Sequence, residues 1–217
     1  MIGWKMNEPI ESIDYKGYVI EIHFDNEPPN CRTDWDNVGK MICFHSRYDL
    51  GDEHDYNSDD YDGWDELHQA IMKDGGIVSL PLYIYDHGGI TMSTGQFSCP
   101  WDSGQVGWII ATRENVEKMM GWGKITKGRQ GQLIDILDNE VKAYDQYLTG
   151  QVYGFKIIDP SGSDVDSCWG YYGEKKDCIS EAESSIDSMV EHDRKTKQEE
   201  TKQSIKAGVP IQYRGAK

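Results

Sequence analysis

Hydrophobic positions along the chain follow two periods, one typical of β-strands and the other of α-helices. Apolar residues alternate with polar ones, or run together with aromatic side chains, in six segments predicted to be strands: 15–24, 40–46, 77–85, 105–112, 151–159 and 165–172. Helical spacing occurs in four others, from Trp64 to the Gly75–Gly76 pair, at 113–120, at about 130–148 and at about 176–205. Because strands and helices do not alternate strictly, this order predicts an α+β fold, a single domain with a mainly antiparallel sheet and flanking helices.

Residues at the segment ends indicate where the helices begin and end. Thr112 is placed to cap the helix that follows it, and Asp62 to cap the helix from Trp64. Gly150 is placed to stop the helix that starts near 130. We also expect segment 40–46 to pair with segment 15–24, which it follows in the chain after a turn.

The C-terminal helix is predicted to be long and to leave the body of the domain. Its apolar stripe, which includes Ile179, Ala182, Ile186 and Met189, ends at Val190. The sequence EHDRKTKQEETKQSIK that follows is polar on every face. We therefore expect a core domain at 1–175, a partly projecting helix at 176–207 and a tail at 208–217.

Acidic residues outnumber basic ones and are concentrated in the first part of the chain. The 217 residues include 38 acidic and 22 basic side chains, a formal net charge of −16. Positions 49–66, the acidic stretch, hold nine acidic residues and neither lysine nor arginine. Such a field attracts basic surfaces and repels nucleic acid and anionic membranes, so we expect neither direct nucleic-acid binding nor membrane association.

Two further features favour a cytoplasmic protein. No apolar run approaches the roughly 20 residues that a transmembrane helix needs, and the N-terminal sequence MIGWKMNEPIE lacks the pattern of a signal peptide. The five cysteines are irregularly spaced and include no C-x-x-C pair. This spacing favours free thiols in a reducing compartment over a disulfide framework.

The string LPLYIYDHGGITMSTGQFSCPWDSGQVGWII at 80–110 places polar groups between two predicted strands. Its glycines and its proline indicate a connection with defined backbone angles. Asp86, His87, Cys99 and Asp102 are the candidate catalytic residues, those of a small hydrolase or nuclease. A cysteine nucleophile needs a neighbouring base, and His87 is the only candidate in this string. The competing interpretation is a purely architectural loop.

No cofactor and no metal are expected from the sequence. Asp86, His87 and Asp102, or Cys43 with His45, carry metal-ligand atoms, but they lack the paired close spacing of a structural zinc site. An EF-hand frame set on Gly63 puts a glutamine where the last, bidentate carboxylate belongs. The phosphate-binding motif G-x-x-x-x-G-K-[ST] does not occur.

The acidic stretch has two interpretations. Exposed carboxylates usually form an ordinary solvated surface. Here, however, aromatic residues interleave with them, and aromatic side chains are common anchors at interfaces. Carboxylates along a rigid edge can also imitate the phosphates of a duplex, which carry one charge per about 1.7 Å of helix axis. The predicted partner-binding residues are Tyr48, Asp49, Asp52, Glu53, Asp55, Asp59, Asp60, Asp62 and Asp65.

Several motifs are similar to those of a known group of proteins. They are WDN at 35–37 with Gly39, Met41, Cys43 and His45, the string at 80–109, YDQYLTG at 144–150 with VYGF at 152–155, and SCWGYYG at 167–173. On these motifs the chain resembles a widespread family of proteins carried by bacteriophages, plasmids and archaeal mobile elements. The resemblance covers about 34–173 and implies a genomic context rather than a particular chemistry.

Three functions follow as expectations. Small acidic phage proteins often act against host defences, an association rather than a mechanism. The first expectation is therefore a non-enzymatic inhibitor in the host cytoplasm, which imitates nucleic acid on a basic surface of a defence nuclease or CRISPR effector. The second is the small hydrolase or nuclease described above. The third is a structural or assembly role in the phage, suggested by the exposed terminal helix. The sequence leaves the oligomeric state open.

Overall fold

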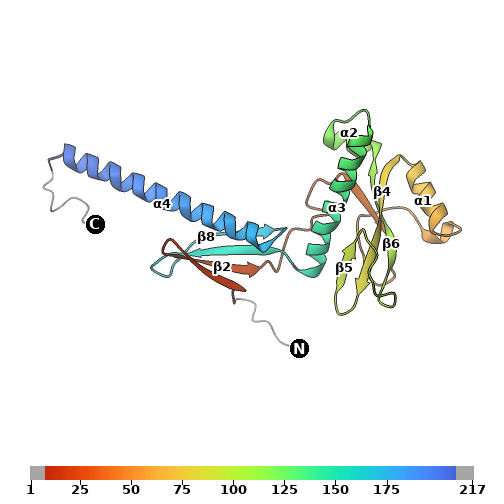
Figure 1. Ribbon diagram of the computed structural model, residues 1–217, viewed down its shortest axis with the longest axis horizontal. Coiled ribbons are helices and arrows are strands. Elements are labelled where there is room, and N and C mark those ends of the chain that lie inside the picture. The colour runs from red at the N-terminus through yellow and green to blue at the C-terminus, as the bar shows by residue number, and fades with distance from the viewer. Residues whose placement is uncertain (1–7, 209–217) are drawn as a thin grey trace. The chain divides into compact units, whose positions relative to one another are not determined.

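The computed structural model describes residues 8–208 and has the predicted fold class (Figure 1). Within those residues, four α-helices accompany eight strands, which form two four-stranded antiparallel sheets. The α+β class with antiparallel strands, flanking helices and a long C-terminal helix is therefore confirmed. The described residues group into two compact units: 8–25 with 153–208, which we call the terminal unit, and 26–152, the inserted unit.

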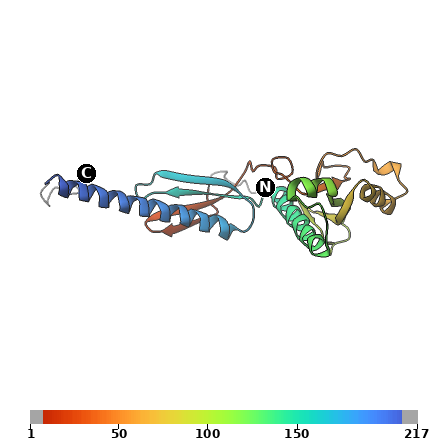
Figure 2. The ribbon, with the colours of Figure 1, turned by 90° about the horizontal axis from the view of Figure 1, so that it is seen from above.

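The terminal unit is a sheet covered on one face by the C-terminal helix (Figure 2). Its strands lie in the order β1 (Glu11–Tyr15), β2 (Tyr18–Phe24), β7 (Tyr153–Ile158) and β8 (Asp164–Tyr171). Alternate residues of β2 and β7 point to one face, where they pack on helix α4 (Lys175–Lys206). Each fully buried isoleucine or phenylalanine there contributes about 1.5–3 kcal/mol. The buried core consists of Ile20, Ile22, Phe155, Ile157, Cys178, Ala182 and Ile186.

Helix α4 is longer than the sheet that it covers. Its last buried residue is Ile186, and from His192 onward every described residue except Ser204 is exposed. Figures 1 and 2 both show the helix continuing past the strands of its own unit. The predicted core at 1–175 contributes to both units, and of the predicted tail at 208–217 only Gly208 lies among the described residues.

The inserted unit holds the second sheet and three helices. Its strands lie in the order β3 (Gly39–Cys43), β6 (Ser103–Thr112), β4 (Gly76–Asp86) and β5 (Ile90–Ser93). The helices are α1 (Trp64–Lys73), α2 (Arg113–Met120) and α3 (Lys127–Thr149), and one 3-10 turn, η1 (Ser58–Asp60), precedes α1. No helix between residues 8 and 208 is both long and apolar enough to cross a bilayer.

Helices α1 and α3 cover opposite faces of the second sheet. Trp108 of β6 belongs to the same buried cluster as Leu67 of α1. The next residue of β6, Ile109, points the other way, as alternation along a strand requires. There it lies near α3, since a Cβ added to Gly39 would stand 2.7 Å from Ile109 and 2.5 Å from Leu137. Glycine at position 39 thus lets β3 approach α3 closely.

Two of the predicted helix ends are confirmed and one is wrong. The Thr112 hydroxyl accepts a hydrogen bond from a backbone N–H in the first turn of α2, and Gly150 ends α3 in the left-handed conformation with φ of 68°. Asp62, however, does not cap α1. The N-cap residue is Gly63, and the Asp62 N–H itself donates to the Glu66 carboxylate at 2.6 Å.

Two strand predictions are also wrong. Segment 15–24 is not one strand, because Lys16 and Gly17, with φ of 50° and 86°, form a tight turn between β1 and β2. Segment 40–46 does not pair with it: β3 pairs with β6, whereas β2 pairs with β1 and β7. Periodicity indicates a strand but not which strand it pairs with, and β7, the second neighbour of β2, follows the whole inserted unit in the chain.

Candidate functional site

Arg32 ties the beginning of the acidic stretch to the core of the inserted unit. Its side chain is only 2% exposed, and its guanidinium donates to both carboxylate oxygens of Asp52, at 2.9 and 2.5 Å. It also donates to the Glu140 carboxylate of α3 at 2.9 Å and to the Gly39 carbonyl at 2.7 Å. Burial alone would lower the pKa of Arg32, but the hydrogen bonds and charges of Asp52 and Glu140 outweigh burial and raise it.

Backbone groups complete this network. The Met41 N–H donates to Asp52 at 2.8 Å, and the Gly51 N–H donates to the Tyr144 hydroxyl of α3 at 3.0 Å. Gly51 has a φ of 75° and lies so near β3 that an added Cβ would stand 2.8 Å from the Met41 carbonyl oxygen. Only glycine fits such a position without strain. The chain is therefore held against β3 where the acidic stretch begins.

Three more contacts fix the acidic stretch before α1 begins. His54 Nε2 donates to the Cys43 carbonyl at 3.0 Å. The Tyr56 hydroxyl donates to Asp74 at 2.7 Å, and burial together with that carboxylate raises the pKa of Tyr56 to about 12. Asn57 caps η1 through its side-chain oxygen. The stretch thus follows a fixed path although it contains little regular structure.

Eight of the nine predicted partner-binding residues are exposed; the exception is Asp52, which is engaged by Arg32. Tyr48 is 37% exposed and stacks on His45, with ring centroids 5.0 Å apart. Of the nine acidic residues in the acidic stretch, Asp52 alone is not exposed. The seven predicted carboxylates at the surface are Asp49, Glu53, Asp55, Asp59, Asp60, Asp62 and Asp65.

These seven surface carboxylates form no ion pair with any residue from 8 to 208. The two arginines nearest to them in sequence are engaged elsewhere, Arg32 in the internal network and Arg47 with Asp86. Unpaired like charges repel one another and lower the stability of the folded chain. A surface that nevertheless keeps them exposed is suited to binding cationic groups from another molecule.

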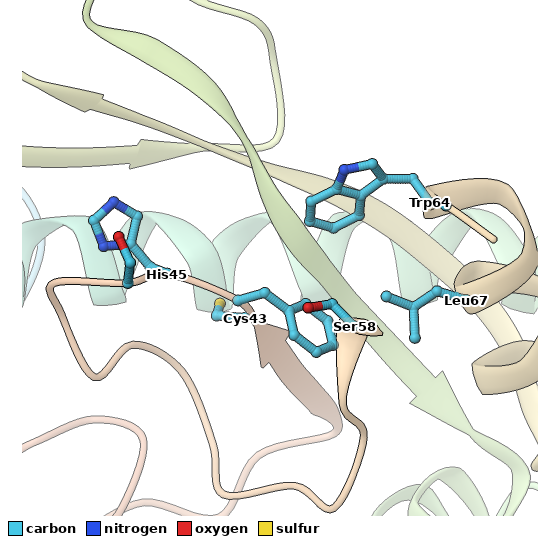
Figure 3. A pocket seen from close by; sticks show the side chains of 8 residues that line it. Cys43, His45, Ser58, Trp64 and Leu67 are labelled. Carbon is cyan, nitrogen blue, oxygen red and sulfur yellow. The ribbon is translucent and has the colours of Figure 1, made fainter. Parts of the chain in front are cut away.

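An aromatic pocket of about 590 Å³ opens beside this surface (Figure 3). Trp64, at the first position of α1, is 41% exposed and stands edge-on to Trp108 and to Phe44, with ring centroids 5.0 and 5.9 Å apart. The sequence analysis does not predict this pocket. The one signal in the sequence that could have indicated it is the helical spacing that turns Trp64 towards the sheet. The lining residues are Cys43, Phe44, His45, Ser46, Ser58, Gly63, Trp64 and Leu67.

A second pocket of about 620 Å³ lies on the acidic stretch itself and shares Cys43 with the first. Burial raises the pKa of the Cys43 thiol to about 12, so the sulfur is protonated at neutral pH and unsuited to act as a nucleophile. Four carboxylates and one lysine line this pocket, and one of the carboxylates, Asp52, is paired with Arg32. The lining residues are Lys40, Cys43, Asp49, Leu50, Asp52, Glu53, His54 and Asp55.

The candidate catalytic residues come together only in part. Asp102 lies between two of them, since its carboxylate is 3.2 Å from His87 Nδ1 and accepts the Cys99 S–H at 3.8 Å. Asp86 pairs with Arg47 instead, and its N–H donates to the Asp102 carbonyl at 2.8 Å. In the described part of the chain, no hydrogen bond joins His87 to Cys99. The nucleophile and base that the hydrolase hypothesis requires are therefore not paired with each other, and Asp102 contacts both.

No group of three or more histidine, cysteine, aspartate or glutamate side chains among the described residues is arranged to hold a metal ion. A comparison of the chain with protein-family models, with curated proteins and with solved structures finds no match. The functional conclusion therefore depends on the acidic stretch, the two pockets and their chemistry.

Proposed function

We propose that this protein is a non-enzymatic inhibitor that binds the basic, nucleic-acid-binding surface of another protein. The observation that supports this function is a set of seven exposed, unpaired carboxylates on a stretch that is held in place through Asp52, His54 and Tyr56. On the resemblance of the sequence, the partner is a host defence nuclease or its guide-RNA complex. The site of action is then the cytoplasm of the host cell.

The fixed path of the acidic stretch favours tight binding. A flexible acidic tail has to be ordered when it binds, at a cost of about 1–2 kcal/mol for each residue whose main chain becomes fixed. Here the main chain is ordered before the partner arrives. Each carboxylate that meets a lysine or arginine takes the place of a phosphate, so the protein and nucleic acid compete for one groove. Tyr48, at the edge of the charged surface, adds an aromatic contact.

The test is inhibition of DNA cleavage by purified guide-RNA effector complexes and restriction nucleases. The variant combines Asp55→Asn, Asp59→Asn, Asp60→Asn and Asp62→Asn. If each lost ion pair contributes about 0.5 kcal/mol, the four together weaken inhibition roughly 30-fold. Inhibition by the native protein should also decline steeply with salt, because several ion pairs break together.

A matched control changes the net charge by the same amount on the terminal unit. It combines Asp164→Asn, Glu181→Gln, Asp193→Asn and Glu200→Gln, all at exposed positions. The control should inhibit like the native protein. The proposal is refuted if no nuclease is inhibited, if both quadruple variants lose inhibition equally, or if inhibition does not depend on salt.

A further inference from the structure

We propose that the aromatic pocket between Phe44 and Trp64 receives an arginine side chain of the partner protein. This inference rests on the proposed function, because it assigns one anchoring contact within the proposed basic surface. It goes beyond that function in naming the residue type that is bound, the pocket that binds it and the ring on which it stacks.

Two aromatic rings, those of Phe44 and Trp64, line the pocket. Trp64 presents a partly exposed indole, while Trp108 and Phe44 meet it at interplanar angles of 62° and 81°. The indole is thereby fixed by edge contacts. Figure 3 shows Trp64 on one side of the pocket and His45 on the other, with Ser58 between them. The volume of about 590 Å³ lies within the range of pockets that hold small molecules, about 300–1,000 Å³.

The charges around the pocket favour a cation. No lysine or arginine lines it, and two of its lining residues, Ser58 and Gly63, are direct chain neighbours of Asp59 and Asp62. Both of these aspartates are exposed and unpaired. The field of these two carboxylates disfavours an anionic group near the pocket. A cationic group gains attraction to the carboxylates and to the negative face of the indole ring.

Arginine fits this combination better than lysine. Its guanidinium is planar, so it can stack on an indole while its N–H groups, which lie in the same plane, donate sideways to carboxylate and hydroxyl oxygens. The ammonium group of lysine is compact and strongly hydrated, and it loses more hydration on entering an aromatic site. The apolar stem of arginine can also pack against the pocket walls while its head group stays near the rim.

Short peptides test the pocket directly. The probes are acetyl-Gly-Arg-Gly-amide and the same peptide with lysine, or with citrulline, which has the shape of arginine without its charge. Binding is followed through the indole N–H signals of the seven tryptophans by NMR, with the Trp64 signal assigned from its absence in Trp64→Leu. The arginine peptide should shift the Trp64 signal saturably, with an affinity at least 10-fold above that of the citrulline peptide and higher than that of the lysine peptide.

Two variants guard against an effect on folding. Trp64→Leu removes the stacking surface, whereas Ser58→Phe fills space from a lining position and leaves the packed rings in place. Both should weaken binding of the arginine peptide at least 10-fold by isothermal titration calorimetry, which does not need the Trp64 signal, while hydrogen exchange of the inserted unit stays native. Trp101→Leu is the control, because Trp101 is 89% exposed on the loop before β6. Equal binding of the citrulline and arginine peptides, or equal loss in Trp101→Leu, would overturn the proposal.

The outcome separates this inference from the proposed function. If the quadruple asparagine variant loses nuclease inhibition while Trp64→Leu and Ser58→Phe keep it, the acidic surface binds without an arginine in the pocket. The proposed function then stands and the present inference is wrong. If the native protein inhibits no nuclease, the proposed function is wrong. The peptide titration then tests by itself whether the pocket binds arginine.

Discussion

Replacing Arg32 with methionine tests whether the internal ion network holds the acidic stretch in place. Methionine is unbranched and flexible, so it fills much of the space without donating a hydrogen bond. The change removes the bonds to Asp52, to Glu140 and to the Gly39 carbonyl. Two carboxylates then remain without their cation, with side chains only 20% and 13% exposed.

The expected loss follows from the partners that remain. Removing one member of a buried ion pair costs about 3–5 kcal/mol, mainly because the remaining charge is uncompensated. Here Asp52 keeps the Met41 N–H at 2.8 Å and Glu140 keeps the Val38 N–H at 2.8 Å, and both retain some contact with water. We therefore expect the free energy of unfolding of the inserted unit to fall by about 3 kcal/mol. Arg32→Lys should lose less, since it keeps the charge but not the planar fork.

The assay is urea unfolding, monitored by hydrogen exchange and mass spectrometry of peptides from 26–152. These peptides report on the inserted unit alone, whereas a global signal would mix the two units. Arg47→Met is the matched control, because Arg47 lies in the same unit and pairs with Asp86 through a side chain that is 66% exposed. It should change stability little. A loss below about 1 kcal/mol in Arg32→Met, no larger than that of a surface ion pair, refutes the reasoning.

The remaining predictions concern thiols, the terminal helix and the central loop. Because burial raises the pKa of Cys43 to about 12, its thiol should stay unreactive towards Ellman's reagent up to about pH 10, whereas the exposed Cys168 should react in the native protein. Truncation after Val190 should leave the melting temperature nearly unchanged, since almost every described residue that it removes, at 191–208, is exposed; a large drop would mean that the removed segment packs on another surface. Cys99→Ser should leave inhibition intact, and a stable but inactive variant would put the hydrolase hypothesis first.

Most elements could be predicted from the sequence because their signals are local. Thr112 and Gly150 act on the turn next to them, and the apolar stripe of α4 is visible at helical spacing. Strand β1 shares only Tyr15 with the predicted segment 15–24, and that segment continues through the turn at Lys16 and Gly17. The pairing of β2 with β7 is not predictable for another reason. It joins two strands that are separated in the chain by the whole inserted unit, and a local sequence pattern does not indicate such a long-range pairing.

The candidate site divides in the same way. The excess of carboxylates at 49–66 is a property of composition, and it predicted correctly which side chains lie at the surface in every case but Asp52. Asp52 differs because Arg32 and Glu140, which are far from each other in the sequence, meet beside it in the core. The aromatic pocket likewise joins the end of β3 to the start of α1 across a long irregular segment. Such long-range contacts depend on the tertiary fold.

The internal network and the exposed carboxylates act against each other in the free protein, and this opposition bears on how salt affects it. Repulsion among like charges spaced closely along the acidic stretch opposes folding, and the bonds of Arg32 offset part of that repulsion from inside. Added salt screens exposed charges beyond about 8 Å at physiological ionic strength, whereas a buried network is screened much less. Salt therefore stabilises the free inserted unit but weakens its attraction to a basic partner. If the surface charges serve an external partner, added salt should raise the stability of the free unit and lower its affinity for the partner. If instead these charges stabilised the fold, added salt should lower both the stability and the affinity.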